Sequence, residues 1–414
     1  MVTTLFLSRN YLPKRELSKE RVHGLLVLCG LLLCIALVRF ETAHIGRWLS
    51  KQVESDHERT YTIAEFDSSS FFEQGIRFGD MWSFVQPEPL LERFHAWFPR
   101  SDAERRFKKK TAIATEALIT NAALMFELSP GNYSNAVSDF RSPVNVLIAF
   151  KASFTEQGPC ELYITRLDSK LNPTRFLKKL SKTHKFGNAW FGPPWREDPR
   201  LFVLGTQLGV AYTVTSAYER NRHAYQVWQR QSYMLLDNKF DKNFSDIFIS
   251  IGNNSEFVDT IYPRFEKNWL FFEANRCLYI IYKIQPFILF QIFDNVHAEL
   301  ITHSVWQPDF TWIHSELRGS APPVRVGGLW YVFAHTASYA VFVAVLSETF
   351  RPIALTREPV LNASSNLFVC GAGFVQSSEQ WLLSAGKNDR KVVMLLIPHS
   401  AIVSKLSPVS TTGR

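Results

Sequence analysis

Short runs of apolar, β-branched and aromatic residues alternate with polar turns over the last two thirds of the chain. Such runs are typical of β-strands. The densest of them are VNVLIAFKAS at 144–153, LGVAYTVTSA at 208–217, CLYIIYKIQP at 277–286, LWYVFAHTAS at 329–338 and QWLLSAGKND at 380–389. Each ends in polar residues, and most are followed by a second run and a turn. The pattern predicts an all-β fold.

The turns that follow the runs resemble one another. They read LDSKLNPTRF at 167–176, LDNKFDKNFS at 236–245 and LSETFRPIAL at 346–355. A strand-and-turn unit that returns at intervals of about 50 to 70 residues favours a propeller of four-stranded blades, and the strand runs predict five blades. A two-sheet sandwich is the alternative, but it leaves the repeat unexplained. In a propeller the polar ends of the inner strands converge on the axis.

The N-terminal part has a different pattern. Residues 22–38, VHGLLVLCGLLLCIALV, contain no Asp, Glu, Lys or Arg, and as a helix they would span about 25 Å. The basic stretch KRELSKER precedes them, so the positive-inside tendency predicts a cytosolic tail at 1–21 and a single-pass type II membrane protein. A cleaved signal peptide is the alternative, although no small-x-small site follows cleanly.

Two further regions follow the predicted anchor. Residues 39–110 are aromatic-rich and partly helical in pattern, so we expect a stem or cap, and we expect the propeller at 111–414. Asn-x-Ser sequons fit a lumenal fate in the Golgi or endoplasmic reticulum; they begin at Asn132, Asn243, Asn253 and Asn362.

Charge and cysteine content narrow the function classes. The chain has 46 Lys and Arg against 38 Asp and Glu, a net charge of +8, which suits a phosphate-bearing or anionic partner. The excess is spread out, and its one dense run, RRFKKK at 105–110, is typical of a solvated face, so we expect no nucleic-acid partner. No CxxC or His/Cys metal spacing occurs, and we expect no metal and no cofactor.

Motifs that occur in order, one in each later blade, resemble glycoside hydrolase family 130. The motifs are WREDPRLF at 195–202, EKNWLFF at 266–272, RGSAPPVRVGGLWYVFAHT at 318–336 and LSAGKNDRKV at 383–392. That family comprises five-bladed β-mannoside phosphorylases and hydrolases, and the mannosyltransferases of glycosyltransferase family 108 are related to it. The resemblance covers roughly residues 130–400 and implies a mannose-directed enzyme.

The acidic and basic residues of WREDPRLF suit a sugar site. An Asp at the axis can accept hydrogen bonds from neighbouring sugar hydroxyls, and a nearby Arg can hold it or grip a phosphate. Asp198 and Arg200 fit these roles, with Glu197 beside them. The alternative is a buried structural ion-pair network among the three side chains.

The resemblance implies further substrate-binding residues in later blades. Lys267, Asn268, Arg318 and His335 would hold a phosphate or diphosphate. Lys267 could instead be a surface cation, and His335 a core histidine whose hydrogen bonds are satisfied.

Three more positions match the family less closely. Asp389 matches the acid of the fifth blade, with a turn-forming residue as the alternative. Asn135 and Lys151 fall near an Asn and an Arg of the first blade.

One position departs from the family pattern. Where the family has its general acid, YTVTS at 212–216 places Ser216, and serine cannot protonate a leaving group. A hydrolase or phosphorylase needs that acid, whereas a sugar-phosphate transferase needs only a base for the acceptor hydroxyl. Asp198, Glu219 or Asp389 could supply it.

These observations leave three functional hypotheses. The first is an inverting, mannose-directed glycosyltransferase that uses a nucleotide sugar or sugar 1-phosphate donor and a glycan acceptor. The second is a β-mannoside phosphorylase or hydrolase, favoured if a carboxylate such as Glu219 replaces the acid missing at Ser216. The third is a catalytically inactive glycan-binding propeller.

Overall fold

The computed structural model describes a nearly all-β chain. The described residues are 61–67, 70, 118–138, 144–153, 160–168, 170–180, 195–221, 224–237, 240, 247–248, 250–251, 268–294, 297–308, 310, 316–388 and 390–413. Within them, no helix is long and apolar enough to cross a membrane. The predicted anchor at 22–38 lies outside them, as does most of the predicted stem.

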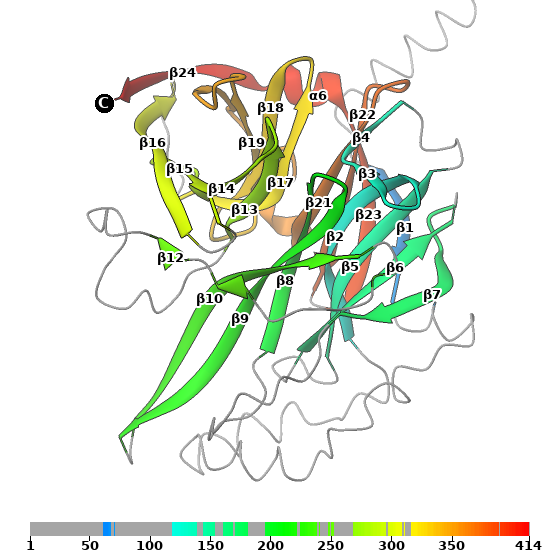
Figure 1. The fold of residues 1–414 in the computed structure, drawn as a ribbon. Helices are drawn as coiled ribbons and strands as arrows, with labels where there is room; N and C mark the ends of the chain where they lie inside the picture. The colour runs from blue at the N-terminus through cyan, green and yellow to red at the C-terminus, as the bar shows by residue number, and fades with distance from the viewer. Residues whose placement is uncertain are drawn as a thin grey trace, which may run out of the picture. The chain divides into compact units, whose positions relative to one another are not determined.

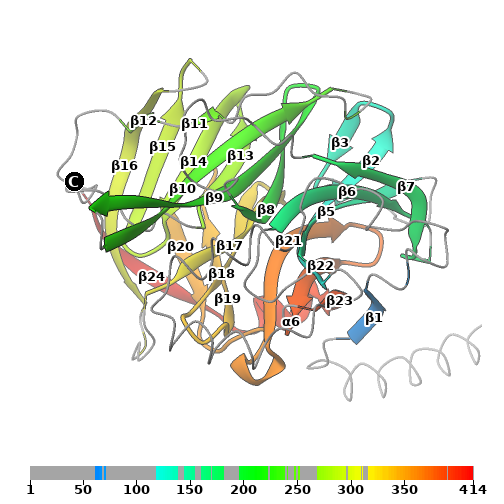
Figure 2. The same cartoon turned by 90° about the horizontal axis from the view of Figure 1, so that it is seen from below.

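Antiparallel four-stranded blades occur five times among the described residues, and four of them are meanders of consecutive strands (Figures 1 and 2). Blade 1 comprises β2 (Leu118–Ser129), β5 (Asn145–Ser153), β6 (Cys160–Leu167) and β7 (Pro173–Lys179), with β3 (Asn132–Ser134) beside β2. Blade 2 comprises β8 (Trp195–Leu204), β9 (Gln207–Asn221), β10 (Ala224–Leu236) and β11 (Ile247–Phe248). Blade 3 comprises β13 (Leu270–Ala274), β14 (Cys277–Lys283), β15 (Phe287–Ile292) and β16 (His297–Pro308), with β12 (Ser250–Ile251) pairing β16.

The last two blades follow the same plan. Blade 4 comprises β17 (Arg318–Val326), β18 (Leu329–His335), β19 (Val341–Leu346) and β20 (Pro352–Thr356). Blade 5 comprises β21 (Leu367–Val375), β22 (Gln380–Lys387), β23 (Lys391–Pro398) and β1 (Tyr61–Phe66), with β4 (Ala136–Val137) beside β21. The short helices η1 (Ala363–Ser365) and α6 (His399–Val403) lie between strands of this part of the chain.

The first strands of the five blades form a closed ring. β2 contacts β8, β8 contacts β13, β13 contacts β17, β17 contacts β21, and β21 contacts β2. The buried apolar residues fall into five clusters, each shared by two neighbouring blades of this ring. The described residues therefore confirm the five-bladed propeller expected from the repeat.

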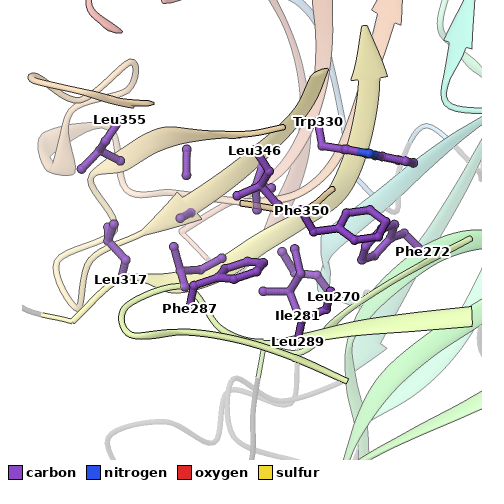
Figure 3. Close-up of a cluster of buried hydrophobic side chains, with 14 of the residues drawn as sticks. Leu270, Phe272, Ile281, Phe287, Leu289, Leu317, Trp330, Leu346, Phe350 and Leu355 are labelled. Atoms are coloured by element: carbon purple, nitrogen blue, oxygen red, sulfur yellow. The ribbon is translucent and has the colours of Figure 1, made fainter. Parts of the chain in front are cut away.

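Both faces of a blade are buried, and this explains the nearly continuous apolar runs in the sequence. In β18, Trp330, Val332 and Ala334 enter the cluster shared with blade 3, part of which Figure 3 shows. Tyr331 and Phe333 point the other way, into the cluster shared with blade 5. Successive strand residues face opposite sides, so a strand packed between two blades needs apolar residues at every position.

The three similar turns have the same backbone. In each, the fifth residue of the turn sequence has a positive φ, and its N–H donates to the carbonyl three residues earlier. The pairs are Leu171 (φ 63°) with Asp168, Phe240 (φ 54°) with Asp237, and Phe350 (φ 61°) with Ser347. These turns follow the third strand of blades 1, 2 and 4, so the sequence repeat is a structural one.

Strands from both ends of the described chain join the sheets. β1 pairs with β23 at the outer edge of blade 5, and β24 (Leu406–Gly413) pairs with both β16 and β20. β1 lies inside the range 39–110 that we expected to form a separate stem or cap. That expectation is wrong for Tyr61–Phe66, because the open edge of β23 supplies the hydrogen bonds that this strand needs.

Candidate active site at one end of the ring

Polar residues in left-handed backbone conformation mark the start of three inner strands. Asn121 in β2 has φ 53°, Asp198 in β8 has φ 54°, and Asn268, just before β13, has φ 66°. The pairing of β2 and of β8 with its neighbour shifts at the same place, between residues 120 and 123 and between 197 and 200. Asn and Asp tolerate this conformation better than other non-glycine residues, and such bulges redirect side chains.

The first consequence is a contact between blades 1 and 2. The Nδ2 of Asn121 donates to Oδ1 of Asp198 over 2.6 Å, and both side chains are buried. Gly386 of blade 5 lets Asn121 sit there, because a Cβ at position 386 would collide with the side chains of Thr120 and Asn121. Asp198 is therefore held in one orientation by an amide that donates but carries no charge.

Arg200 lies at the centre of this group and exposes only 1% of its surface. Its guanidinium donates to the carbonyl oxygens of Asp198 over 2.7 Å and of Pro199 over 3.2 Å, and to Oδ1 of Asn268 over 3.4 Å. It lies 5.4 Å from the ring centroid of Phe368 in blade 5. Among the described residues its Nε has no hydrogen-bond partner, and none of the ion pairs found there involves Arg200.

His335 joins the group from the end of β18 in blade 4. Its Nδ1 lies 2.9 Å from Oγ of Ser320, and its ring meets Phe368 edge-on at 5.0 Å and stacks on Tyr339 at 5.8 Å. Arg318 pairs with His335 across the β17–β18 ladder and is exposed. The imidazole ring of His335 is thus buried, and the exposed cation Arg318 lies beside it.

The imidazole of His335 is kept neutral by its surroundings. Burial is the main cause that lowers its pKa to about 3, the charge of Arg200 adds to the effect, Asp198 opposes it, and Arg318 lowers it further. A neutral imidazole can donate one hydrogen bond and accept another. The positive charge of the site at neutral pH therefore comes from guanidinium groups and not from this histidine.

Two other predicted residues lie at the same end of blades 1 and 2. Lys151 of β5 pairs with Thr120, next to Asn121, and Glu197 pairs with Thr213. The structure therefore brings Asp198, Arg200, Asn268, Arg318 and His335 together from three blades, with Glu197 next to Asp198 in β8 and Lys151 on β5. Their roles as ligands stay a prediction.

Four predicted residues are described only in part or not at all. Lys267 and Asp389 lie outside the described residues. Ser216 and Glu219 belong to β9, where their backbones pair with Trp228 and Tyr225 of β10, but their side chains are not described. Glu219 follows Ser216 by about 10 Å along the strand, so it does not share the backbone position at which the family has its acid.

The structure corrects the predicted position of Asn135. Its Nδ2 donates to the carbonyl of Pro323 over 3.0 Å, and its own carbonyl accepts from the N–H of Phe374. Phe374 is near the end of β21 that is opposite to Phe368. Asn135 therefore ties blade 1 to blades 4 and 5 away from Asp198, because the short strand β4 carries the chain along β21 in this direction.

The sequence interpretation missed three residues of the group: Asn121, Phe368 and Tyr339. Asn121 had a detectable signal, since it is a polar residue that interrupts the apolar run LITNAALMF. Phe368 had none, because an aromatic residue in an apolar run is the ordinary composition of a strand, and nothing in the turn sequence HTASYA marks Tyr339.

Two further observations concern metal and thiol chemistry. Within the described part of the chain, no three His, Cys, Asp or Glu side chains are grouped so that they could hold a metal ion. Cys160, Cys277 and Cys370 are free thiols. Burial raises the pKa of the Cys160 thiol well above its ordinary value, so it is unreactive as a nucleophile.

Comparison with known proteins gives matches in structure only. No protein-family model matches the chain, and no curated protein matches its sequence. Similar solved structures include β-1,2-mannobiose phosphorylase from Listeria innocua, with 12% identity, a TM-score of 0.45, and coverage of 70% of this chain and 92% of that one. Another is the mannose phosphorylase MPT-4 from Leishmania mexicana, with 9% identity, a TM-score of 0.41, and coverage of 76% and 96%.

A third similar structure belongs to the family named from the motifs. It is a glycoside hydrolase of family 130 that targets β-1,2 mannosidic linkages in Candida mannan, with 15% identity and a TM-score of 0.40. The match covers 68% of this chain and 84% of that one. At such identities and TM-scores the likeness concerns the course of the chain alone and supports no conclusion about family or activity.

Proposed function

We propose that this protein is a glycosyltransferase that moves a mannose-type sugar from a phosphate-bearing donor to a glycan acceptor. The observation that carries the proposal is Arg200, a buried guanidinium for which no acidic partner occurs among the described residues, placed beside an oriented carboxylate. A buried cation is stable when an anion compensates it. A phosphate would supply that anion and would accept the hydrogen bond that Nε does not make.

The neighbouring side chains suit the sugar end of such a donor. Asp198, held by Asn121, can accept hydrogen bonds from two adjacent hydroxyls, and Asn268 and neutral His335 can donate to others. The exposed Arg318 extends the positive charge toward solvent, where a second phosphate of a nucleotide sugar would lie. The site thus offers partners for both the charged and the uncharged part of a sugar phosphate.

The proposed transfer is a single displacement. The acceptor hydroxyl oxygen bonds to the anomeric carbon as the bond from that carbon to the phosphate oxygen breaks, which inverts the configuration. The phosphate leaves with the electron pair, and Arg200 and Arg318 stabilise its charge. The acceptor proton passes to a carboxylate, Asp198, Glu219 or Asp389, so no proton donor is needed at Ser216.

A panel of donors tests the proposal. Full-length protein in detergent is incubated with nucleotide sugars or sugar 1-phosphates, with and without mannose acceptors, and products are measured by mass spectrometry. We expect transfer that survives Ser216→Ala and is abolished by Asp198→Asn, since Asn also adopts φ 54° and keeps the fold. Asp168→Asn, the same change in a turn at the other end of blade 1, is the matched control. Absence of transfer from every donor would contradict the proposal.

The same cations would also bind inorganic phosphate, which favours β-mannoside phosphorylase as the second candidate. It requires a general acid other than Ser216, and Glu219 is the nearest carboxylate in β9. Release of mannose 1-phosphate from a β-mannoside and phosphate, lost in Glu219→Gln, would identify this reaction instead. Binding of mannosides without turnover would indicate the third hypothesis, a glycan-binding propeller.

We further propose that the propeller lies in the lumen of the Golgi or endoplasmic reticulum, anchored by residues 22–38. Two sequon asparagines within the described residues, Asn132 and Asn362, are exposed, as glycosylation requires. Protease added to sealed microsomes should spare the chain beyond about residue 40, and glycosidase digestion should increase its electrophoretic mobility. Degradation of the propeller in intact vesicles would overturn this topology.

A further inference from the structure

Tyr339 is an exposed aromatic residue in a strained turn next to the candidate site. The turn joins β18 to β19, and the N–H of Tyr339 donates to the carbonyl of Thr336 over 2.9 Å. Its φ is 66°, a conformation that is costly for a bulky side chain. Its side chain nevertheless remains 47% exposed.

Tyr339 is more exposed than the other apolar or aromatic residues with positive φ. The apolar or aromatic residues with positive φ in the described chain are Leu171, Phe240, Phe350 and Tyr339. The first three expose between 1% and 8% of their surface, so burial of the side chain offsets the backbone strain. Tyr339 has no comparable burial to offset it, and uncompensated strain of this kind is typical of functional positions.

The ring of Tyr339 is the outer member of a row of groups in contact that begins at Arg200. The guanidinium of Arg200 lies over Phe368 at 5.4 Å, and Phe368 meets Tyr339 edge-on at 5.6 Å and an interplanar angle of 76°. His335 stacks on Tyr339 with an interplanar angle of 21°. The row orients the tyrosine ring and connects it, through Phe368, to Arg200.

We infer that Tyr339 is a stacking platform for the sugar ring of the ligand whose phosphate binds at Arg200. The inference rests on the proposed function and adds a specificity-determining residue to it. The carbon-bound hydrogens on one face of a pyranose carry a partial positive charge, and the face of an aromatic ring is negative. A sugar phosphate combines such a face with the anion that Arg200 requires.

Binding of two probes distinguishes a platform from a structural role. Isothermal titration of full-length protein in detergent compares inorganic phosphate with mannose 1-phosphate. Tyr339→Asn keeps a residue that adopts positive φ but removes the ring, and Tyr339→Phe keeps the ring. We expect Tyr339→Asn to weaken mannose 1-phosphate binding by about 3- to 10-fold and to leave phosphate binding unchanged, whereas Tyr339→Phe binds both probes like the original protein.

Glu379→Asn is the matched control, since Glu379 is also exposed and has φ 47° but lies in the turn at the other end of blade 5. It should change neither affinity. Unchanged mannose 1-phosphate binding in Tyr339→Asn would overturn the inference while leaving the proposed function intact. An equal loss of both probes would also overturn it, because it would indicate a structural role. Failure of the original protein to bind either probe would overturn both proposals.

Discussion

Two arginines at opposite ends of the ring, half-buried Arg166 and buried Arg200, have different surroundings. Arg166, in β6, donates through Nε and a terminal nitrogen to the two carboxylate oxygens of Glu127 over 2.6 and 2.8 Å. It also lies over the rings of Phe176 and Phe240. Arg200 also lies over an aromatic ring, that of Phe368. It donates only to carbonyl oxygens and to an amide oxygen, and its Nε has no partner among the described residues.

The difference separates a structural ion pair from a guanidinium that we propose binds a ligand. Glu127 also accepts a hydrogen bond from the Nδ2 of Asn145, and the hydrogen bond that Arg166 donates to Glu127 is the main cause that raises the pKa of Arg166. Phe240 comes from blade 2, so the pair also helps to join two blades. Arg166 is paired within the fold, whereas the Nε of Arg200 has no partner among the described residues, and we propose that a ligand supplies one.

The largest expected effect is on the structural pair. Arg166→Met leaves Glu127 buried without its cation and should lower the free energy of unfolding by about 3 to 5 kcal/mol, measured by urea denaturation at pH 7. Replacing both partners, Glu127→Leu with Arg166→Met, should recover most of the loss because no buried charge remains. A loss below about 1 kcal/mol in the single variant would contradict the structural role.

The same change at the other arginine should act on binding instead. Arg200→Met should leave the free energy of unfolding within about 1 kcal/mol of the original, since it removes a buried cation whose Nε is unpaired. It should weaken phosphate binding by at least about tenfold, the equivalent of one charged hydrogen bond. Arg325→Met, at an exposed arginine, is the control and should change neither quantity. A large loss of stability in Arg200→Met with unchanged phosphate binding would show that Arg200 has a structural role and not a binding one.

The neutral histidine beside Arg200 gives a pH dependence. The folded pKa of His335 is about 3 and the unfolded value about 6.5, so the unfolded chain binds the proton first. This contribution to stability is complete above about pH 6.5 and is lost as the pH falls toward 3, with a slope of at most about 1.4 kcal/mol per pH unit. Urea denaturation across this range should give a smaller slope for His335→Asn, which can keep the bond to Ser320. Equal slopes would show that the ring is already protonated in the folded state.

The smallest expected effect concerns the orientation of Asp198. Asn121→Gly accepts φ 53° but removes the 2.6 Å hydrogen bond, and should lower the free energy of unfolding by about 1 kcal/mol. Transfer activity should fall further than in Asn366→Gly, a control in which an exposed Asn with φ 50° is replaced. Equal activity in the two variants would mean that Asp198 does not need Asn121.

The amino-acid sequence by itself determined the strands, the repeat and the number of blades. Apolar residues on both faces of a strand, as in β18, and turns of one kind, as at Leu171 and Phe350, are local properties that a single sequence displays. It also indicated Asp198 and Arg200, because two charges and a proline beside a buried strand are unusual. The strand that closes blade 5 was not predictable, since β1 and β23 are separated by over three hundred residues.

Only the tertiary structure decided which polar groups meet. The bulges that start β2 and β8 bring Asn121 to Asp198 across 77 positions of sequence, and ring closure places Phe368 against Arg200. It also decided that Asn135 lies elsewhere. Tyr339 is exposed, although the three other apolar or aromatic residues with positive φ are buried, and this too depends on the tertiary structure. A pattern of apolar and polar residues encodes which face of a strand is buried, but the partner across the axis depends on how five blades close into one ring.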